Sequence, residues 1–239
     1  MVIYTYTFNI SLNTVQKDIE KNNLNRLGSM VNNLDHNVEQ LNLLSVALEV
    51  NSQIGLLSSI DKMDSYDQVS LMLDLTEKMK LQSFSQGWKN QISIYSPLIN
   101  KWIGTNDSYP PSQTDLKGSQ WTYEPLLGRF TTYRNNRTFT IRVTFPQTNL
   151  HEILNRAKIE NNDPFFYQTG NAIILNRYSD TGKVNKIKSI LAPLLNDQKE
   201  GTEIISVDGV EYMVNYFRSE KLGWYIIDYL PLDQVLQPI

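Results

Sequence analysis

The chain has 239 residues, of which 41% are hydrophobic and 20% charged, so it is long enough for one large domain or two small ones and apolar enough for a packed core. Its net charge of −3 removes most of the long-range attraction on which nucleic-acid binding depends, and the absence of cysteine excludes disulfides, thiolate metal sites and cysteine nucleophiles. His36 and His151 lie in no recognisable metal or catalytic motif.

A long helix is expected in the first 85 residues, which contain no proline and hold 10 acidic against 6 basic residues. From Leu24 onward, apolar residues recur at spacings of three and four, which predicts a helix with one continuous apolar seam. Two interpretations of the seam remain open: it packs against the protein's own sheet, or it forms a dimer interface, and both can hold along different stretches. A second helix is expected at about residues 67–85. The seam positions are Leu24, Leu27, Val31, Leu34, Val38, Leu41, Ser45 and Leu48.

After Gly87 an alternating pattern replaces the helical one, and a mostly β region is expected. The best strand is Arg137–Phe145, with apolar residues on one face and Thr138, Thr140, Arg142 and Thr144 on the other. It is expected to form a tight hairpin with residues 129–134, because Asn135-Asn136 tolerates the positive φ that such a turn demands. Symmetric pairing about this turn places Arg129 opposite Arg142.

The C-terminal third repeats the change from helix to strand. A helix is expected at about residues 149–158 and a domain boundary at Asn161–Pro164. Strands are expected at 165–169, 172–178, 210–218 and 223–230, with a helix at about 184–195. Asp208-Gly209 is a strong signal for a type I′ hairpin turn. The expected fold is therefore α+β: a long N-terminal helix with two modules, each a small antiparallel sheet flanked by helices. The parts are 1–85, 86–160 and 161–239.

No run approaches the 18 or more apolar residues of a membrane-spanning helix, so the chain as given is expected to be soluble. Residues 1–10 are apolar and β-branched but have no basic segment and no small-residue cleavage site, unlike a signal peptide. A segment cut out after a missing membrane span would begin in this way.

Four stretches of the sequence follow the order of one receptor architecture. They are the end of the seam helix, Val38–Leu44; a strand that runs through an Asn-Leu pair into a helix, Phe139–Leu154; the hairpin segment Phe165–Asp180; and the closing strands, Val207–Gly209, Tyr212–Tyr216, Leu222–Ile227 and Leu230–Leu232. This order resembles the double Cache (PAS-like) extracellular sensor domains of bacterial receptors, in particular those of YesM-like sensor histidine kinases. Segment 101–129 does not align with the family.

The resemblance implies a ligand-sensing domain of a two-component histidine kinase, on the extracytoplasmic face of the bacterial membrane and continued by missing transmembrane helices. It implies a carbohydrate-related signal, either a sugar or a sugar-loaded solute-binding protein, and a homodimer through the N-terminal helix. No cofactor or metal is expected. The residue set that marks amino-acid-binding members is incomplete, since Arg142 and Thr140 occupy the strand where its aspartate is expected.

Positive charge concentrates in residues 125–151, which contain four arginines and no acidic residue. Like charges opposed across a hairpin repel, so Arg129 facing Arg142 needs splayed side chains or an anion between them. Guanidinium groups suit a carboxylate, phosphate or sulfate, and the hairpin therefore predicts a pocket for an organic anion or an acidic sugar. The simpler alternative for the same cluster is a solvated hairpin face or a contact with the acidic first helix.

Aromatic residues before the hairpin offer surfaces for stacking a sugar or a cation, although aromatics in so small a module are first of all core. The candidate ligand-binding residues are Arg129, Thr131, Tyr133, Thr140, Arg142, Trp121, Tyr123 and Trp102.

Catalysis has little support, because the sequence contains no nucleophile elbow, no H-E-x-x-H and no phosphate-binding glycine loop. The expected activity is binding. Two alternatives remain: the ectodomain of a chemoreceptor or of a cyclic-nucleotide signalling enzyme, and a coiled-coil scaffold without a small ligand that uses the Leu24–Leu48 seam.

Overall fold

A computed structural model describes residues 2–85, 87–107, 109–112, 120–159, 162–170, 172–177, 179–195 and 198–235, with side chains from residue 14 onward except those of residues 85 and 235. Within these ranges no single helix is long and apolar enough to span a membrane, whereas Thr14–Glu49 and Ser52–Lys62, bent by 55° at the break between them, meet the length and composition requirement as a pair.

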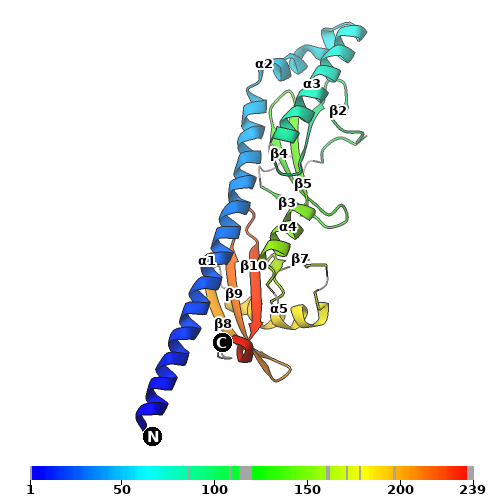
Figure 1. Ribbon diagram of the computed structural model, residues 1–239. Helices are drawn as coiled ribbons and strands as arrows, with labels where there is room; N and C mark the ends of the chain where they lie inside the picture. Colours follow the sequence, from blue (N-terminus) through cyan, green and yellow to red (C-terminus); the bar gives the residue numbers. More distant parts are fainter. Residues whose placement is uncertain are drawn as a thin grey trace. The chain divides into compact units, whose positions relative to one another are not determined.

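Two compact units make up the chain: Met1–Asp35 with Leu150–Ile239, and His36–Asn149. Each contains a five-stranded antiparallel sheet (Figure 1), which confirms the predicted α+β class. The first helix, α1 (Val2–Glu49), contributes to both units, whereas the sequence suggested a separate helical part at 1–85. The predicted domain boundary lies between residues 160 and 161, and both of these residues are outside the described ranges.

The unit of residues 36–149 holds the end of α1, α2 (Ser52–Gly55), η1 (Leu56–Lys62) and α3 (Ser65–Ser85). Its sheet has the order β2-β1-β5-β4-β3, and α3 lies against β1 and β2 (Figure 1). One face of the sheet is apolar and fully buried, with Ile94, Phe130, Ile141 and Phe145 all at 0% exposure. The strands are β1 (Gln91–Ser96), β2 (Lys101–Ile103), β3 (Thr122–Glu124), β4 (Arg129–Asn135) and β5 (Thr140–Pro146).

The predicted seam of α1 is buried within the chain along most of its length. In one unit Leu27, Val31 and Leu34 are at most 1% exposed, and in the other Val38 and Leu41 are equally covered. Over this stretch the seam packs against the protein itself, which confirms the first of its two interpretations.

The β4–β5 hairpin forms as expected, but its register is four residues away from the predicted one. Tyr133, not Arg129, pairs with Arg142, and Arg129 pairs with Pro146. The reason is the position of the turn: the Asn136 N–H donates to the Phe139 carbonyl at 2.9 Å, so the chain reverses at residues 137–138 and not at 135–136. A shift by an even number of residues keeps every side chain on its predicted face but separates the two arginines.

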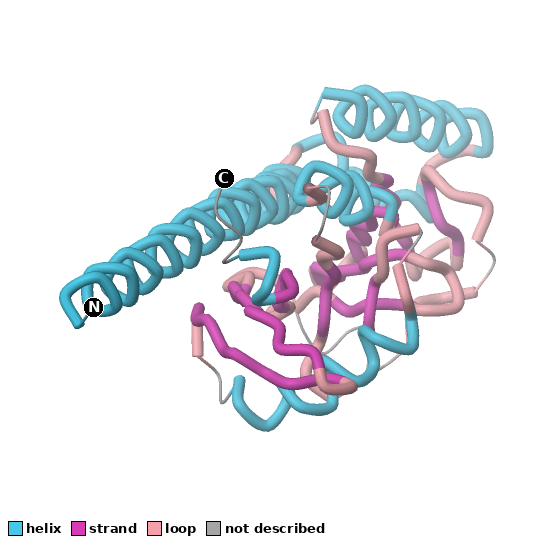
Figure 2. Tube along the Cα trace, turned by 60° about the horizontal axis from the view of Figure 1, so that its bottom comes forward, coloured by secondary structure: helices cyan, strands magenta, loops and turns pink. Residues whose placement is uncertain are grey.

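The other unit is built on the order β7-β6-β10-β9-β8, with β6 (Phe165–Tyr167), β7 (Ile173–Ile174), β8 (Glu200–Val207), β9 (Val210–Arg218) and β10 (Tyr225–Pro231). Helix α5 (Thr181–Leu195) buries Val184, Ile187 and Leu191 against one face of this sheet. The first part of α1 lies on the opposite face (Figures 1 and 2). Helix α4 (Thr148–Ala157) precedes the sheet, and α6 (Leu232–Val235) follows it and lies against β9 and β10.

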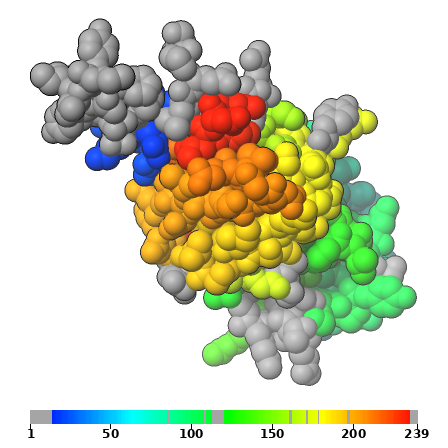
Figure 3. Space-filling view, turned by 90° about the horizontal axis from the view of Figure 1, so that it is seen from below, coloured from blue at the N-terminus to red at the C-terminus, as the bar shows by residue number. Residues whose placement is uncertain are grey.

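Seen from below, β8, β9 and α5 form one continuous surface of this unit, with the C-terminal segment beside it (Figure 3). The predicted Asp208-Gly209 turn is confirmed: Val207 pairs with Val210, and both turn residues have positive φ, 53° and 79°. The predicted strand 172–178 is reduced to two residues in the described part, and Tyr178 lies outside it.

Two carboxylates attach α1 to this sheet. Asp228 of β10 is fully buried and accepts hydrogen bonds from Arg26 of α1 and from Asn162. Asp35 of α1 accepts from the Ser219 hydroxyl and, at 2.9 Å, from the Glu220 N–H in the β9–β10 connection. Helix and sheet are therefore joined by polar contacts as well as by apolar packing.

Candidate functional site

The face of the β1–β5 sheet opposite the apolar core is polar and yet largely buried. Alternate residues of β1, β4 and β5 point to it, and the register places Ser93 opposite Arg142 and Thr131 opposite Thr144. The exposed fractions of these four residues are between 1% and 5%. The Thr131 hydroxyl has no hydrogen-bond partner among the described residues. A buried face rich in hydroxyl and guanidinium donors is better suited to binding a polar molecule than to forming a core.

Arg142 is the centre of this face. Its side chain is 6% exposed, its Nε donates to the Ser93 hydroxyl at 3.1 Å, and its Nη2 donates to a carboxylate oxygen of Asp107. The guanidinium carbon lies 4.2 Å from the centre of the Trp102 ring, which is a cation–π contact. We call Ser93, Trp102, Asp107 and Arg142 the Arg142 site.

Asp107 is the solvent-facing member of the Arg142 site, with a side chain 44% exposed. Partial burial acts against its charged form, but the hydrogen bond from Arg142 and the charges of Arg142 and Arg129 outweigh that effect and lower the pKa of Asp107 below its usual value. Asp107 and Trp102 also line a hollow of about 600 Å³, together with Lys80 of α3 and Gln91. This volume lies in the range of small-molecule pockets.

Two of the other three arginines of the hairpin have acidic partners of their own. Arg129 bonds to Glu124 at 3.1 Å across β3 and β4, and Arg134 bonds to Glu49 of α1. Arg137 is exposed. The expected facing pair of Arg129 and Arg142 is therefore wrong, and the alternative of a contact with the first helix is confirmed for Arg134.

The predicted candidates separate into two groups. Trp102, Thr131, Tyr133 and Thr140 belong to the same face as Arg142, as does Arg129 at the far end of β4. Two aromatics contact the apolar face instead. Trp121 packs its ring 4.9 Å from Phe145 and donates to Asn42 of α1 at 3.0 Å. Tyr123 packs 4.8 Å from Phe130, and burial raises its pKa.

Two members of the Arg142 site were not among the predicted residues. Asp107 lies in the segment that did not align with the family, and no local pattern marks it. Ser93 lies on β1, which was expected only as part of a general β region; the alternation of Ile92 and Ile94 around it was the available signal.

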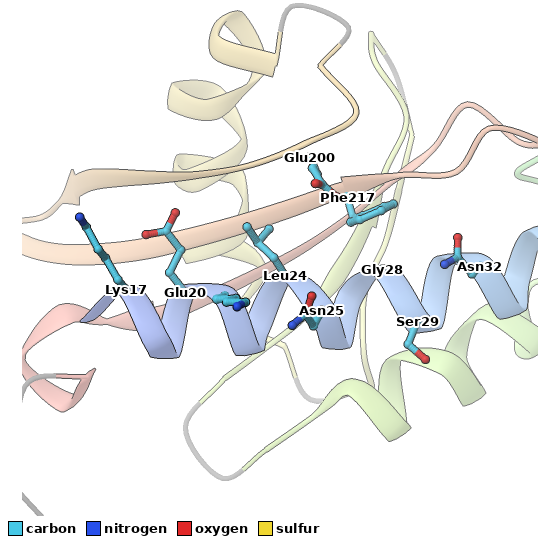
Figure 4. Close-up of a pocket in the computed structure, with 10 residues that line it drawn as sticks. Lys17, Glu20, Leu24, Asn25, Gly28, Ser29, Asn32, Glu200 and Phe217 are labelled. Atoms are coloured by element: carbon cyan, nitrogen blue, oxygen red, sulfur yellow. The ribbon is translucent and has the colours of Figure 1, made fainter. Parts of the chain in front are cut away.

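A larger hollow of about 780 Å³ lies in the other unit, between α1 and the β8–β9 edge (Figure 4). Phe217 and Glu200 face α1 across it, and a Cβ atom at Gly28 would come within 2.9 Å of the Phe217 ring. Its charged residues, Lys17, Glu20, Lys21 and Glu200, are of mixed sign and partly or fully exposed. Across the described ranges, no group of three or more His, Asp or Glu side chains is placed to hold a metal ion.

No protein-family model matches this sequence, and no curated protein matches it. Solved structures do match the fold. The extracellular domain assigned to a histidine kinase, vpHK1S-Z8, is 10% identical, with a TM-score of 0.61 over 95% of this chain and 98% of that one. The ligand-binding domain of Mlp24 with asparagine is 14% identical, with a TM-score of 0.57 over 93% and 97%. The ligand-binding domain of the Pseudomonas aeruginosa amino-acid chemoreceptor PctC, in complex with GABA, is 15% identical, with a TM-score of 0.52 over 85% and 96%.

At these identities the likeness concerns the fold. It confirms the predicted architecture of a long helix with two PAS-like modules, which extracellular domains of histidine kinases and chemoreceptors share. The assignment to YesM-like kinases stays a prediction.

Proposed function

We propose that the chain is the extracytoplasmic ligand-sensing domain of a membrane-bound signalling receptor, and that the Arg142 site binds its small-molecule signal. The observation that carries the proposal is a buried arginine on a polar sheet face, beside a hollow of about 600 Å³. The fold supports it, because domains of this fold serve as ligand-binding domains of receptors. A histidine kinase and a chemoreceptor are equally compatible with this fold as the receptor to which the domain belongs. The role of the domain itself is binding, not catalysis.

The guanidinium group of Arg142 narrows the class of ligand. The sequence favoured a sugar, a sugar-loaded solute-binding protein or an organic anion. A buried guanidinium favours the organic anion among these, because it offers planar, charge-assisted donors. Amino acids join the candidates because PctC binds GABA and the Mlp24 domain was solved with asparagine.

Transmission within the unit of residues 36–149 has a structural basis. The ligand-binding sheet is tied to α1 by the Arg134–Glu49 ion pair and by the hydrogen bond from Trp121 to Asn42. A ligand that prefers one arrangement of sheet and helix shifts the receptor only by its difference in affinity for the two arrangements. We propose that α1, and the second module at 161–239, carry that shift to flanking membrane spans.

Thermal-shift measurements against acetate, succinate, GABA, L-asparagine, L-valine, galactose, galacturonate and phosphate test the binding function. At least one compound is expected to raise the melting temperature of the wild type, because a ligand of the folded state stabilises it. Arg142→Gln should weaken that binding by about 10-fold or more, as loss of a charge-assisted hydrogen bond implies. Arg137→Gln is the matched control, because Arg137 is exposed. No shift with any compound would count against the proposal.

We also propose a homodimer through α1, supported by exposed apolar residues on its last turns and directly after it: Leu43 and Val46 are 52% and 38% exposed, and Val50, the residue after α1, is 79% exposed. Sedimentation velocity is expected to show reversible self-association of the wild type. Leu43→Lys with Val46→Lys should shift the equilibrium to monomer, because both charges would be buried in the interface. A wild type that stays monomeric at high concentration contradicts this.

A further inference from the structure

Arg142 already holds a carboxylate, and that carboxylate is supplied by the protein. The Asp107 carboxylate accepts a hydrogen bond from Nη2 of Arg142, on the side that faces solvent. The Ser93 hydroxyl accepts from Nε, and the Trp102 ring lies against the guanidinium plane. Asp107 and Trp102 also line the adjoining hollow, so the two residues that contact the guanidinium are themselves accessible from that hollow.

We propose that the ligand of this site carries a carboxylate that displaces Asp107 from Arg142, so that Asp107 is a built-in competitor that sets the affinity. The inference rests on the proposed ligand-binding function and names its ligand class. An incoming carboxylate restores the hydrogen bond that Asp107 gives up, and the released Asp107 is hydrated at the surface, where its side chain already is 44% exposed. The exchange thus replaces one anionic partner of Arg142, which is 6% exposed, with another.

The exchange also explains selectivity. A small anion without further groups gains only the hydrogen bond to Arg142 that Asp107 gives up, so its net binding free energy is small. A carboxylate with further groups gains contacts with the Trp102 ring and the hollow, where Lys80 adds a second positive charge. Once Asp107 leaves the guanidinium, segment 104–107, which follows β2, loses its ion pair with β5, and occupancy of the site is thereby coupled to the conformation of this segment.

Acetate is the probe, because it reproduces the carboxylate that Asp107→Ala removes. Melting temperatures of wild type, Asp107→Ala and Asp107→Asn are compared in sodium acetate, in sodium chloride of equal ionic strength, and in acetamide, the neutral isostere. Acetate is expected to bind both variants about 10-fold more tightly than the wild type, as follows if Asp107 occupies Arg142 for about nine-tenths of the time. Acetamide and chloride should not discriminate.

Two controls keep the result specific. Glu220→Gln makes the same change in net charge as Asp107→Asn at an exposed pair with Lys199 in the other unit, and should leave acetate affinity as in the wild type. Asp107→Ala combined with Arg142→Lys or with Arg142→Gln should lose the gain; two replacements are used so that poor folding of one does not hide the effect.

The outcomes are distinguishable from those of the proposed function. Equal acetate binding by wild type and Asp107 variants overturns the competitor, even if another compound raises the melting temperature of the wild type. Weaker binding of zwitterionic amino acids by Asp107→Asn also overturns it, because Asp107 would then hold the ammonium group. Acetate rescue without any response of the wild type to the wider panel would support the carboxylate position while counting against the receptor ligands proposed above.

Discussion

Asp228→Ala is expected to lower the free energy of unfolding by about 3 kcal/mol at pH 7, since removal of one partner leaves a largely buried charge uncompensated. Asp228 is fully buried and bonds to Arg26 of α1 and to Asn162 at 3.0 Å. The Arg26 side chain is 21% exposed and keeps a hydrogen bond to the Ala157 carbonyl at 2.7 Å, so the loss falls at the lower end of the range for buried pairs. Urea unfolding followed by circular dichroism measures it.

Asp228→Asn removes the charge of Asp228 but keeps a side chain that can form hydrogen bonds. The pH dependence of the stability difference between this variant and the wild type therefore reports on the charge alone. Burial raises the pKa of Asp228 from 3.8 to about 6, despite the opposing hydrogen bond from Asn162 and the charge of Arg26. The folded state therefore binds this proton more tightly than the unfolded state does, and the stability that the proton contributes is complete below about pH 4 and lost as the pH rises through 6. Between pH 4 and pH 7, the stability of the wild type relative to Asp228→Asn should fall by about 2 kcal/mol.

Glu220→Ala provides the control for the Asp228 variants, because Glu220 pairs with Lys199 at the surface of the same unit. It should leave both the stability and its pH profile close to those of the wild type. A stability difference between wild type and Asp228→Asn that stays constant from pH 4 to pH 7 would show that Asp228 is not protonated in this range in the folded state.

The parts of the fold that local patterns determine were predictable. The spacing of Leu27 to Leu48 predicts the buried side of α1, and Asp208-Gly209 predicts its turn because both positions need positive φ. The alternation in β5 assigns Arg142 and Phe145 to opposite faces, and the structure agrees.

Register and long-range partners were not predictable from the same patterns. Asn135-Asn136 fits a two-residue turn by propensity, but the chain closes the loop between Asn136 and Phe139, which preserves the faces and moves Arg129 away from Arg142. Asp107 is 35 residues from Arg142 in a segment without periodicity, and only the tertiary fold brings them together. The sequence therefore indicated the correct sheet face and the correct arginine, while the acidic partner required the structure.

Phe145→Ala is expected to destabilise the unit of residues 36–149 by about 3–5 kcal/mol, the cost of truncating a fully buried phenylalanine. Three aromatic rings surround this side chain: Trp88, Phe130 and Trp121, with centroids 4.7, 4.8 and 4.9 Å away. Removing the ring leaves a cavity in this cluster and loses three aromatic contacts at once. Urea unfolding followed by tryptophan fluorescence reports directly on two of the three neighbours.

The same substitution tests how the Arg142 site depends on the core beneath it. Residues 142 and 145 lie on opposite faces of β5, so loosening the apolar face removes the support that holds the guanidinium in place. Binding of any compound that stabilises the wild type should weaken in Phe145→Ala, and Phe84→Ala, which removes a ring that is 85% exposed, should change neither stability nor binding. Unchanged affinity in a destabilised Phe145→Ala protein would mean that the polar face keeps its geometry without the aromatic cluster, and that ligand contacts alone organise the site.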